Sequence, residues 1–310
     1  MPTINPAVSP THLFPPNDVQ QSMLSNAIAI ALKEDFAKLG DLTSLALIEE
    51  SQRATADLIA KADGVVAGND VFEAVFAQVS ADCCVEWHVR EGDTISTGQT
   101  LARVRGPTRA ILSAERVALN FLQRASGIAT ATHAMVQRMR HGSDTCALLD
   151  TRKTVPTLRA LDKAAVRAGG GANHRFGLYD MMMIKDNHID AAGGISSAIE
   201  KAAAFLKSSA LPVNIEVETR TLDEVREACR HKESVQRVML DNMSPATMRE
   251  AVAVVRADAP DMEIEASGNI SLSTVAEVAA TGVDCISSGA LTHSVVALDV
   301  SLKNLTPVIE

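Results

Sequence analysis

The sequence predicts an α/β fold with a parallel sheet in the second half of the chain. After residue 142, short apolar runs alternate with helical patterns, which is typical of parallel βαβ units. The runs that qualify as strands are 146–150, 164–168, 180–185, 214–218, 237–241, 262–266 and 284–288. Polar residues end most of these runs, where the active site of an α/β barrel lies. A doubly wound open sheet is the alternative, but a glycine-rich first turn of the dinucleotide-binding type is missing from the sequence.

The first half of the chain predicts a smaller α+β domain. Apolar residues at every fourth position predict a helix over 18–39, with Asp18 as its cap and Gly40 as its stop. Strands are predicted over 54–60, 65–67 and 85–89, and further helices over 69–80, 108–125 and 127–140. A proline-rich start predicts an extended or mobile arm over residues 1–17.

The composition argues against several classes of protein. The chain has 310 residues, 46% of them hydrophobic, and a net charge of −9, which favours a large core and disfavours nucleic acid as a partner. Its apolar runs are shorter than the ~18 residues of a membrane span, and no secretory signal is recognisable, so we expect a cytoplasmic protein. The five cysteines lack a CxxC pattern and are expected to be reduced. His174, His188 and His293 lack the spacing of a transition-metal site.

The segment from Asp150 to Ile189 carries the strongest functional pattern. One predicted strand ends at Asp150 and leads into Arg152 and Lys153, and a second ends at Lys185. Arginine suits carboxylates and phosphates through paired hydrogen bonds. The three consecutive glycines between these strands allow a ligand to approach the backbone closely. The segment therefore predicts a site for an anion.

Later strands also end in polar groups. Glu216 and Glu218 stand two residues apart and so share a face of one strand, and Asp241 ends the next. Carboxylates at neighbouring strand ends suit ribose hydroxyls or a magnesium ion. The turns at 267–269 and 287–290 follow strands and can present backbone N–H groups to a phosphate.

Together these motifs resemble the quinolinate phosphoribosyltransferase family, also called carboxylating nicotinate-nucleotide pyrophosphorylases. The family order is DTRKT, GGGANHR, YDMMMIKDNHI, IEVE, LDNM, EASGNI and SSGALTHS, and the resemblance covers about residues 27–302. It implies an incomplete parallel α/β barrel of six or seven strands at 128–293. It also implies an N-terminal α+β open-sandwich domain at 1–127, which the tail at 294–310 rejoins. The family commonly has glycine where Thr157 stands and an aromatic residue where Ala164 stands.

The resemblance also implies an activity and the residues that perform it. The implied reaction, in NAD biosynthesis, joins phosphoribosyl pyrophosphate to quinolinate and yields nicotinate mononucleotide, pyrophosphate and carbon dioxide. Catalytic roles are implied for Lys153, Lys185, Glu218 and Asp241, and the two carboxylates would also contact Mg²⁺, directly or through water. Substrate contacts are implied for these four and for Arg116, Thr151, Arg152, His174, Arg175, Ser267, Gly268, Asn269, Ser288, Gly289, Ala290 and His293. Within this set, Arg116, Arg152, His174 and Arg175 would hold the carboxylates of quinolinate, and the serine–glycine turns with His293 would hold the 5′-phosphate.

The resemblance implies a homodimer that shares its active sites through Arg116, and such dimers could stack into a hexamer. Two other functions stay open. A phosphoribosyltransferase of the same fold could act on a different acid or base. The strand and turn pattern around Lys61 also resembles the small domains that carry biotin or lipoate, with Lys61 as the attachment point, and intact mass would separate this reading from the others.

Overall fold

The computed structural model describes residues 17–308, which divide into two compact units. The first unit comprises residues 134–153 and 171–290, and the second comprises 17–133, 154–170 and 291–308. Apart from Asn17, the arm predicted over residues 1–17 lies outside the described residues. Within the part that is described, no helix combines the length and apolar character needed to cross a membrane.

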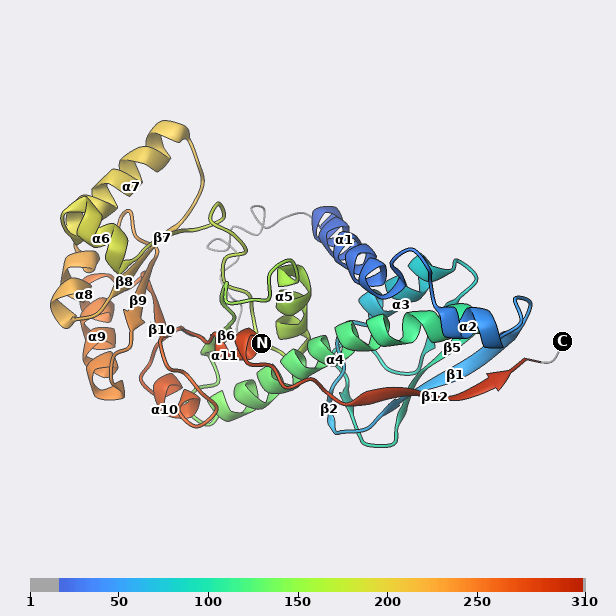
Figure 1. Cartoon of the computed structure of the whole chain (residues 1–310). Coiled ribbons are helices and arrows are strands. Elements are labelled where there is room, and N and C mark those ends of the chain that lie inside the picture. The colour runs from blue at the N-terminus through green and yellow to red at the C-terminus, as the bar shows by residue number, and fades with distance from the viewer. Residues whose placement is uncertain (1–16, 309–310) are drawn as a thin grey trace. The chain divides into compact units, whose positions relative to one another are not determined.

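The first unit is built on a six-stranded parallel sheet with the order β6-β11-β10-β9-β8-β7 (Figure 1). The strands are β6 (Ala147–Leu149), β7 (Met182–Ile184), β8 (Ile215–Thr219), β9 (Arg237–Asp241), β10 (Glu263–Ser267) and β11 (Cys285–Ser287). The helices are α6 (Asp186–Ala192), α7 (Ile195–Ser209), α8 (Leu222–Cys229), α9 (Pro245–Asp258) and α10 (Val275–Ala279). This arrangement confirms the predicted incomplete α/β barrel, with six strands.

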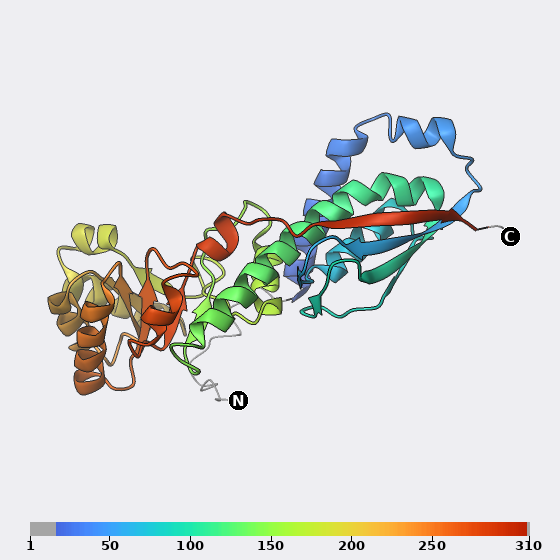
Figure 2. The same ribbon diagram turned by 90° about the horizontal axis from the view of Figure 1, so that it is seen from below.

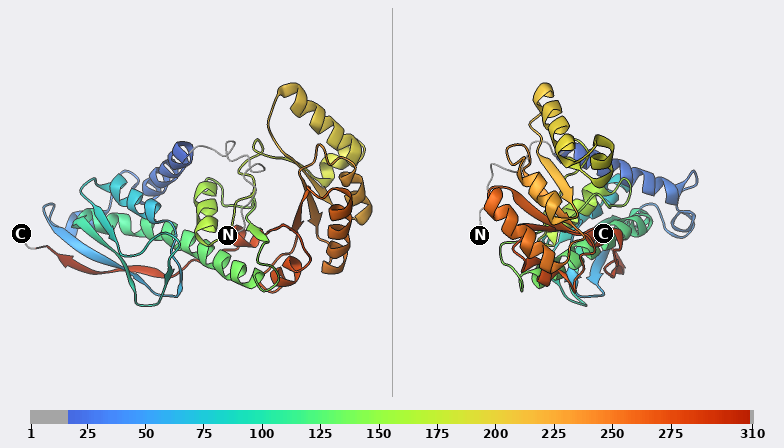
Figure 3. Two further views of the ribbon diagram at one scale, coloured as in Figure 1. Left: turned by 180° about the vertical axis from the view of Figure 1, so that it is seen from behind. Right: turned by 90° about the vertical axis from the view of Figure 1, so that its left-hand side faces the viewer.

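Burial and capping explain these elements. All residues of β8 are buried, as expected of a central parallel strand that is covered on both faces. Helix α8 begins where the Thr221 side chain accepts a hydrogen bond from the Glu224 amide. Helix α9 begins with Ser244 as cap and Pro245 as its first residue. Helices α7, α8 and α9 follow the strands in sequence and lie along one face of the sheet (Figure 3).

The predicted strand at 164–168 is wrong, because these residues end the helix α5 (Arg159–Ala168). Short apolar runs cannot be assigned to strand or helix by periodicity alone. Here Leu161 and Ala165 are buried four residues apart, which is a helical spacing. Arg124 adds two hydrogen bonds to the buried Asp162 carboxylate, at 2.9 and 2.7 Å, and so fixes the helix from its polar side.

The second unit contains an antiparallel sheet with the order β12-β1-β5-β3 and helices around it. Its strands are β1 (Arg53–Ala60), β2 (Gly64–Val65), β3 (Cys84–Trp87), β4 (Thr94–Ile95), β5 (Thr100–Pro107) and β12 (Val300–Pro307), of which β2 and β4 form a separate pair. Its first helices are α1 (Asn17–Phe36), α2 (Leu42–Leu47) and α3 (Asn69–Val79). Alternate residues of β1 are buried, which is the period of a strand with one face on the core. The last strand, β12, runs along β1 (Figure 2).

Several predicted boundaries change. The helix expected over 18–39 is α1, which begins at Asn17, so Asp18 lies inside it, and the strand expected over 65–67 shortens to β2. The helices expected over 108–125 and 127–140 are one helix, α4 (Thr108–Met139). Gly127 lies inside α4, and a glycine is required there because the Val296 carbonyl oxygen occupies the space that a Cβ would take. This glycine permits close packing and does not end a helix.

Candidate active site

The predicted site residues of the first unit gather at the carboxyl edge of its sheet. Lys185 directly follows β7, and Asp241 and Ser267 are the last residues of β9 and β10 and pair with each other in register. Arg152 follows β6 closely, and Glu218 lies near the end of β8. Because all six strands are parallel, their carboxyl ends meet at this one edge.

Asp150 ties the segment after α5 to the end of β6. Its buried carboxylate accepts a hydrogen bond from the His174 amide at 2.8 Å and another from the Asn173 side-chain amide at 2.6 Å. A parallel bridge between Leu149 and Ala172 supports the same junction. The residues that follow, Arg175 above all, are therefore held beside the strand end.

Arg152 and Arg175 form a cationic pair at this edge. The Arg175 guanidinium donates to the Met181 carbonyl oxygen at 3.0 Å, and among the residues that the structure describes it makes no ion pair. Burial and then the positive charge of Arg152 lower the pKa of Arg175. Both guanidinium groups are half-buried, and guanidinium groups suit carboxylates through paired hydrogen bonds.

Lys185 and Glu218 form an ion pair across the ends of β7 and β8. The Lys185 Nζ atom lies 3.4 Å from Glu218 Oε2, and the lysine side chain is 46% exposed. Such a partly exposed pair contributes only about 0–1 kcal/mol to stability. The pair matters for position, because it holds the Lys185 ammonium group at the edge of the sheet and leaves that group accessible to a ligand.

Two asparagines connect the ends of β9 and β10. The Asn242 side chain donates to Asp241 Oδ2 at 2.8 Å and accepts from the Asn269 side chain at 3.0 Å. Both asparagines have φ of 54°, the left-handed conformation that asparagine tolerates. Gly268 has φ +96°, and a Cβ there would overlap the Asn242 side chain. The chain of contacts fixes the Asp241 carboxylate relative to the turn at 267–269.

Gly268→Ala should therefore lower the melting temperature more than an ordinary glycine substitution does. The left-handed backbone alone costs about 1–2 kcal/mol with an alanine, and the overlap with Asn242 adds to it. Gly193→Ala is a matched control, because Gly193 has φ +89° but nothing within 4 Å of a Cβ. Thermal unfolding of both variants measures the difference. Equal shifts in melting temperature would contradict the proposed overlap.

In the turn after β11, hydrogen bonds within the protein already use the Ser288 groups predicted to contact a phosphate. Ser288 is buried, its amide donates to the Leu149 carbonyl oxygen at 3.0 Å, and its hydroxyl donates to the Ile270 carbonyl oxygen at 3.0 Å. The Ser287 hydroxyl donates to that of Ser267 at 3.0 Å. Ser288 thus shapes the turn that carries Gly289 and Ala290.

The remaining predicted residues make none of the contacts described above. Arg116 and His293 belong to the second unit, Arg116 exposed on α4 and His293 at the end of α11 (Ala290–His293). His293 Nδ1 lies 2.6 Å from the Ser294 hydroxyl. In the first unit, Thr151 Oγ1 accepts a hydrogen bond from the Lys153 amide at 3.0 Å, and the Lys153 side chain is exposed.

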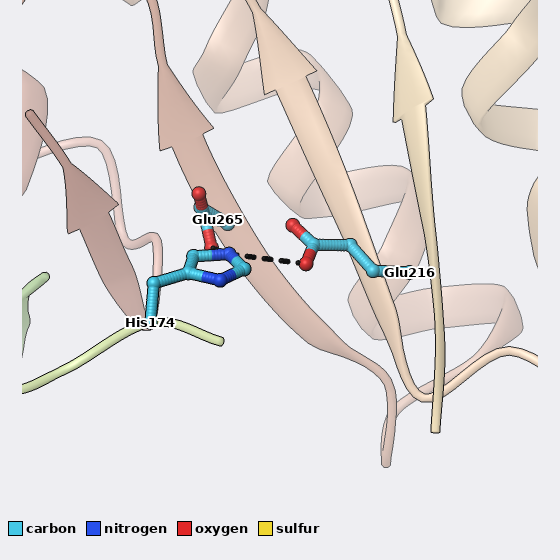
Figure 4. A group of neighbouring side chains, drawn as sticks. All are labelled: His174, Glu216 and Glu265. Carbon is cyan, nitrogen blue, oxygen red and sulfur yellow. Dashed lines mark ion pairs between the residues drawn. The ribbon is translucent and has the colours of Figure 1, made fainter. Parts of the chain in front are cut away.

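A buried charged cluster inside the sheet was missed by sequence reasoning. His174 Nε2 lies 3.1 Å from Glu216 Oε2 and 3.1 Å from Glu265 Oε2 (Figure 4). Arg237 Nη1 adds an ion pair of 3.0 Å to Glu265. The two glutamates and the arginine interrupt the apolar strands β8, β10 and β9, and an unpaired charge at such an inward position would be strongly destabilising. That interruption is the sequence feature that could have revealed the cluster.

Opposing effects set the protonation of this cluster. Burial disfavours a charged imidazole, but the charges of Glu265 and Glu216 outweigh it and raise the pKa of His174 to about 10. Burial and the charge of Glu265 raise the pKa of Glu216, whereas His174 overcomes the effect of burial and lowers the pKa of Glu265 to about 2. The Arg175 amide, however, donates to His174 Nδ1 at 2.7 Å, so Nδ1 must hold a lone pair. The lone pair on Nδ1 leaves the imidazole proton on Nε2, which faces the two carboxylates.

Comparisons with known proteins agree along most of the chain. The family described as "Quinolinate phosphoribosyl transferase, C-terminal domain" matches residues 128–303, and the corresponding N-terminal domain matches residues 41–126. The chain is 46% identical over 293 residues to "Quinolinate phosphoribosyltransferase [decarboxylating] 2, mitochondrial" of Nicotiana glauca, covering 90% of this chain and 82% of that one. It is 43% identical over 263 residues to "Probable nicotinate-nucleotide pyrophosphorylase [carboxylating]" of Bacillus subtilis, covering 85% and 87%.

Solved structures give the same result. The crystal structure of NadC from Streptococcus pyogenes matches with a TM-score of 0.86 and 38% identity, covering 93% of this chain and 98% of that one. The nicotinate-nucleotide pyrophosphorylase of Francisella tularensis matches with a TM-score of 0.84 and 36% identity, covering 92% and 96%. With both family domains matched and relatives above 40% identity over nearly its whole length, the chain belongs to the quinolinate phosphoribosyl transferase family.

Proposed function

We propose that this protein transfers the phosphoribosyl group of phosphoribosyl pyrophosphate to quinolinate with decarboxylation, giving nicotinate mononucleotide, pyrophosphate and carbon dioxide. The observation that carries the proposal is the placement of the cationic residues Arg152 and Lys185 closely after β6 and β7, at the carboxyl edge of the sheet, in a chain that both family domains match. A dicarboxylate is the kind of ligand that such cations hold, an arginine through parallel hydrogen bonds. Family membership favours this transferase over a biotin or lipoate carrier with Lys61 as attachment point.

The roles follow from where charge develops. As the quinolinate nitrogen forms its bond to the anomeric carbon, the bond from that carbon to the pyrophosphate oxygen breaks and the sugar ring becomes cationic. Glu218 and Asp241 would stabilise that ring, while Lys153 and Lys185 would stabilise the leaving pyrophosphate. Loss of carbon dioxide then leaves an electron pair on the carbon beside the positively charged ring nitrogen, and this carbon takes up a proton from solvent to give nicotinate mononucleotide. For that step, a fixed position of the quinolinate carboxylates and the exclusion of water from the site matter more than a general base.

Glu218 and Asp241 also fit a magnesium ion. They offer only oxygen atoms, from the neighbouring strands β8 and β9, and the ion prefers oxygen donors while keeping several of its waters. When bound, magnesium would neutralise charge on the pyrophosphate group. The turn residues Ser267–Asn269 and Ser288–Ala290, with His293, are our proposed contacts to the 5′-phosphate.

Removal of magnesium should abolish activity, and Asp241→Asn should raise the KM for phosphoribosyl pyrophosphate about 10- to 100-fold. The amide has one oxygen fewer for a cation and carries no charge, although it keeps the size of the side chain. Initial rates with and without chelator, followed by addition of magnesium, measure the first effect. Asp223→Asn on the exposed start of α8 is a matched control that should behave like the unchanged protein. Full activity after exhaustive chelation would refute the metal proposal.

The activity itself is tested with two acceptors. Purified protein with phosphoribosyl pyrophosphate should release carbon dioxide and pyrophosphate in equal amounts from quinolinate, and should make little product from nicotinate, which lacks the second carboxylate. The competing possibility is a transferase of the same fold with a different acid or base as its substrate. Turnover of nicotinate without turnover of quinolinate would favour that alternative.

Assembly and location complete the proposal. We propose a homodimer with shared active sites, in which Arg116 reaches the pocket of the neighbouring subunit, and a hexamer of three such dimers as the larger form. The exposed position of Arg116 supports this, as do the exposed apolar side chains of α1 and α2, among them Ile30 and Leu47. We propose a cytoplasmic location, whereas some relatives carry the words mitochondrial or chloroplastic in their names.

A further inference from the structure

We infer that Glu216, Glu265 and Arg237 form a buried positioning network that fixes the His174 ring and, through it, the main chain of Arg175. The inference rests on the proposed function, because it assigns Arg175 to the substrate carboxylates. The network lies inside the six-stranded sheet, and its three members come from the adjacent strands β8, β10 and β9.

The contacts of the network converge on one nitrogen atom. His174 Nε2 stands between the Oε2 atoms of Glu216 and Glu265, at 3.1 Å from each (Figure 4). Arg237 holds Glu265 in turn, with 3.0 Å between Nη1 and the same Oε2 atom. A second contact, 2.7 Å from Arg237 Nη2 to Glu263 Oε2, anchors the guanidinium. The imidazole ring is thus held from a rigid sheet.

The other ring nitrogen, Nδ1, connects the fixed imidazole ring to the main chain of Arg175. The Arg175 amide donates to His174 Nδ1 at 2.7 Å, and the His174 amide donates to Asp150 at 2.8 Å. The main chain at these two residues therefore has one anchor in the sheet interior and one at the end of β6. The Arg175 guanidinium starts from this fixed main chain and lies close enough to Arg152 for their charges to interact.

The burial of the network argues against a purely structural role. Glu216 and Glu265 are fully buried, and His174 is 5% exposed. Apolar side chains of similar volume often stabilise a core as well as a buried ion pair does, so packing alone gives no reason for these charges. A need to fix the orientation of a ligand-binding segment does give a reason for these charges, because hydrogen-bonded partners behind a functional side chain commonly hold it in place.

A metal ion is the competing occupant. One ligand atom from each of His174, Glu216 and Glu265 can be chosen so that all lie within 4.8 Å of one another. Arg237, however, already supplies positive charge to the Glu265 oxygen that a cation would use. Arg237 thus occupies the side of Glu265 Oε2 on which a cation would lie, while both Glu216 oxygens and Glu265 Oε1 are buried without a hydrogen-bond partner among the described residues.

The test measures quinolinate binding by calorimetry, together with steady-state kinetics, for Glu265→Gln and Glu216→Gln. A small displacement of a substrate-holding group can cost a factor of about 100, so we expect quinolinate affinity to fall about 10- to 100-fold. The KM for phosphoribosyl pyrophosphate should stay within about twofold of the unchanged protein, because that substrate is not assigned to Arg175. Glu227→Gln is a matched control, since Glu227 accepts hydrogen bonds from Ser196 away from the sheet edge. It should alter stability without altering quinolinate affinity.

A second measurement needs no variant to fold. In protein labelled with ¹⁵N-histidine, His174 should give a slowly exchanging Nε2–H resonance and an unprotonated Nδ1. The inference would be overturned if both variants bound the two substrates more weakly to an equal extent, or if their quinolinate affinity were unchanged. A rapidly exchanging Nε2 proton, or stoichiometric metal in the purified protein, would also overturn it. Absence of quinolinate binding by the unchanged protein would instead overturn the proposed function, and the resonance would still report on the network.

Discussion

Arg152→Ala is expected to lower kcat/KM for quinolinate by a factor between about 30 and several thousand. Truncating one partner of a buried, hydrogen-bonded charge pair costs about 2–5 kcal/mol, and each 1.4 kcal/mol is about a factor of ten. The structure supports the assignment, because Arg152 follows β6 at the functional edge of the sheet and its charge acts on Arg175. Steady-state kinetics at saturating phosphoribosyl pyrophosphate measures the loss.

The variant should stay folded, since Arg152 lies outside the helices and strands and contributes little to the core. Arg226→Ala provides a matched loss of an arginine, because within residues 17–308 the ion-pair partner of Arg226 is the exposed Asp223 on α8. We expect Arg226→Ala to leave the kinetics unchanged. Near-normal quinolinate kinetics in Arg152→Ala, with a normal melting temperature, would show that Arg152 does not hold a carboxylate.

The fold could be predicted from the sequence wherever local patterns carry the information. Six of the expected strands are present because each is an apolar run bounded by turns, and burial inside a parallel sheet requires that pattern. The run at 164–168 satisfied the same pattern although it lies in a helix. Its environment depends on the contact between Arg124 and Asp162, which are 38 positions apart, so a short window does not reveal it.

The candidate site divides in a similar way. Lys185, Glu218 and Asp241 could be found because polar residues after apolar runs mark strand ends. The charges of Glu216 and Glu265 inside apolar strands could have indicated a buried cluster, but its connection to His174 could not be found, because it joins a loop to the interior positions of two different strands. The paired amides of Asn242 and Asn269 likewise depend on which strands are neighbours in the sheet.

The Arg116→Ala variant and the Lys153→Ala variant should each be nearly inactive alone. Activity should return when the two variant chains are coexpressed and form mixed dimers. Lys153 is exposed beside Arg152 in the first unit, and Arg116 is exposed on α4 in the second. Among the described residues Arg116 forms no ion pair, so its guanidinium is open to a ligand or to another subunit. If the residue serves the pocket of a partner in a two-fold dimer, each pocket takes Arg116 and Lys153 from different chains.

Mixed dimers distinguish this arrangement from one in which both residues come from a single chain. In the shared arrangement, a mixed dimer has one pocket that lacks both side chains and one pocket that is intact. Random pairing makes half of the dimers mixed, so coexpressed variants should recover about one quarter of the original activity. Arg226→Ala coexpressed with Lys153→Ala controls for activity contributed by an unaltered pocket. If dimers shown by mass to contain both Arg116→Ala and Lys153→Ala chains stay as inactive as either parent, Arg116 does not act in the partner's site.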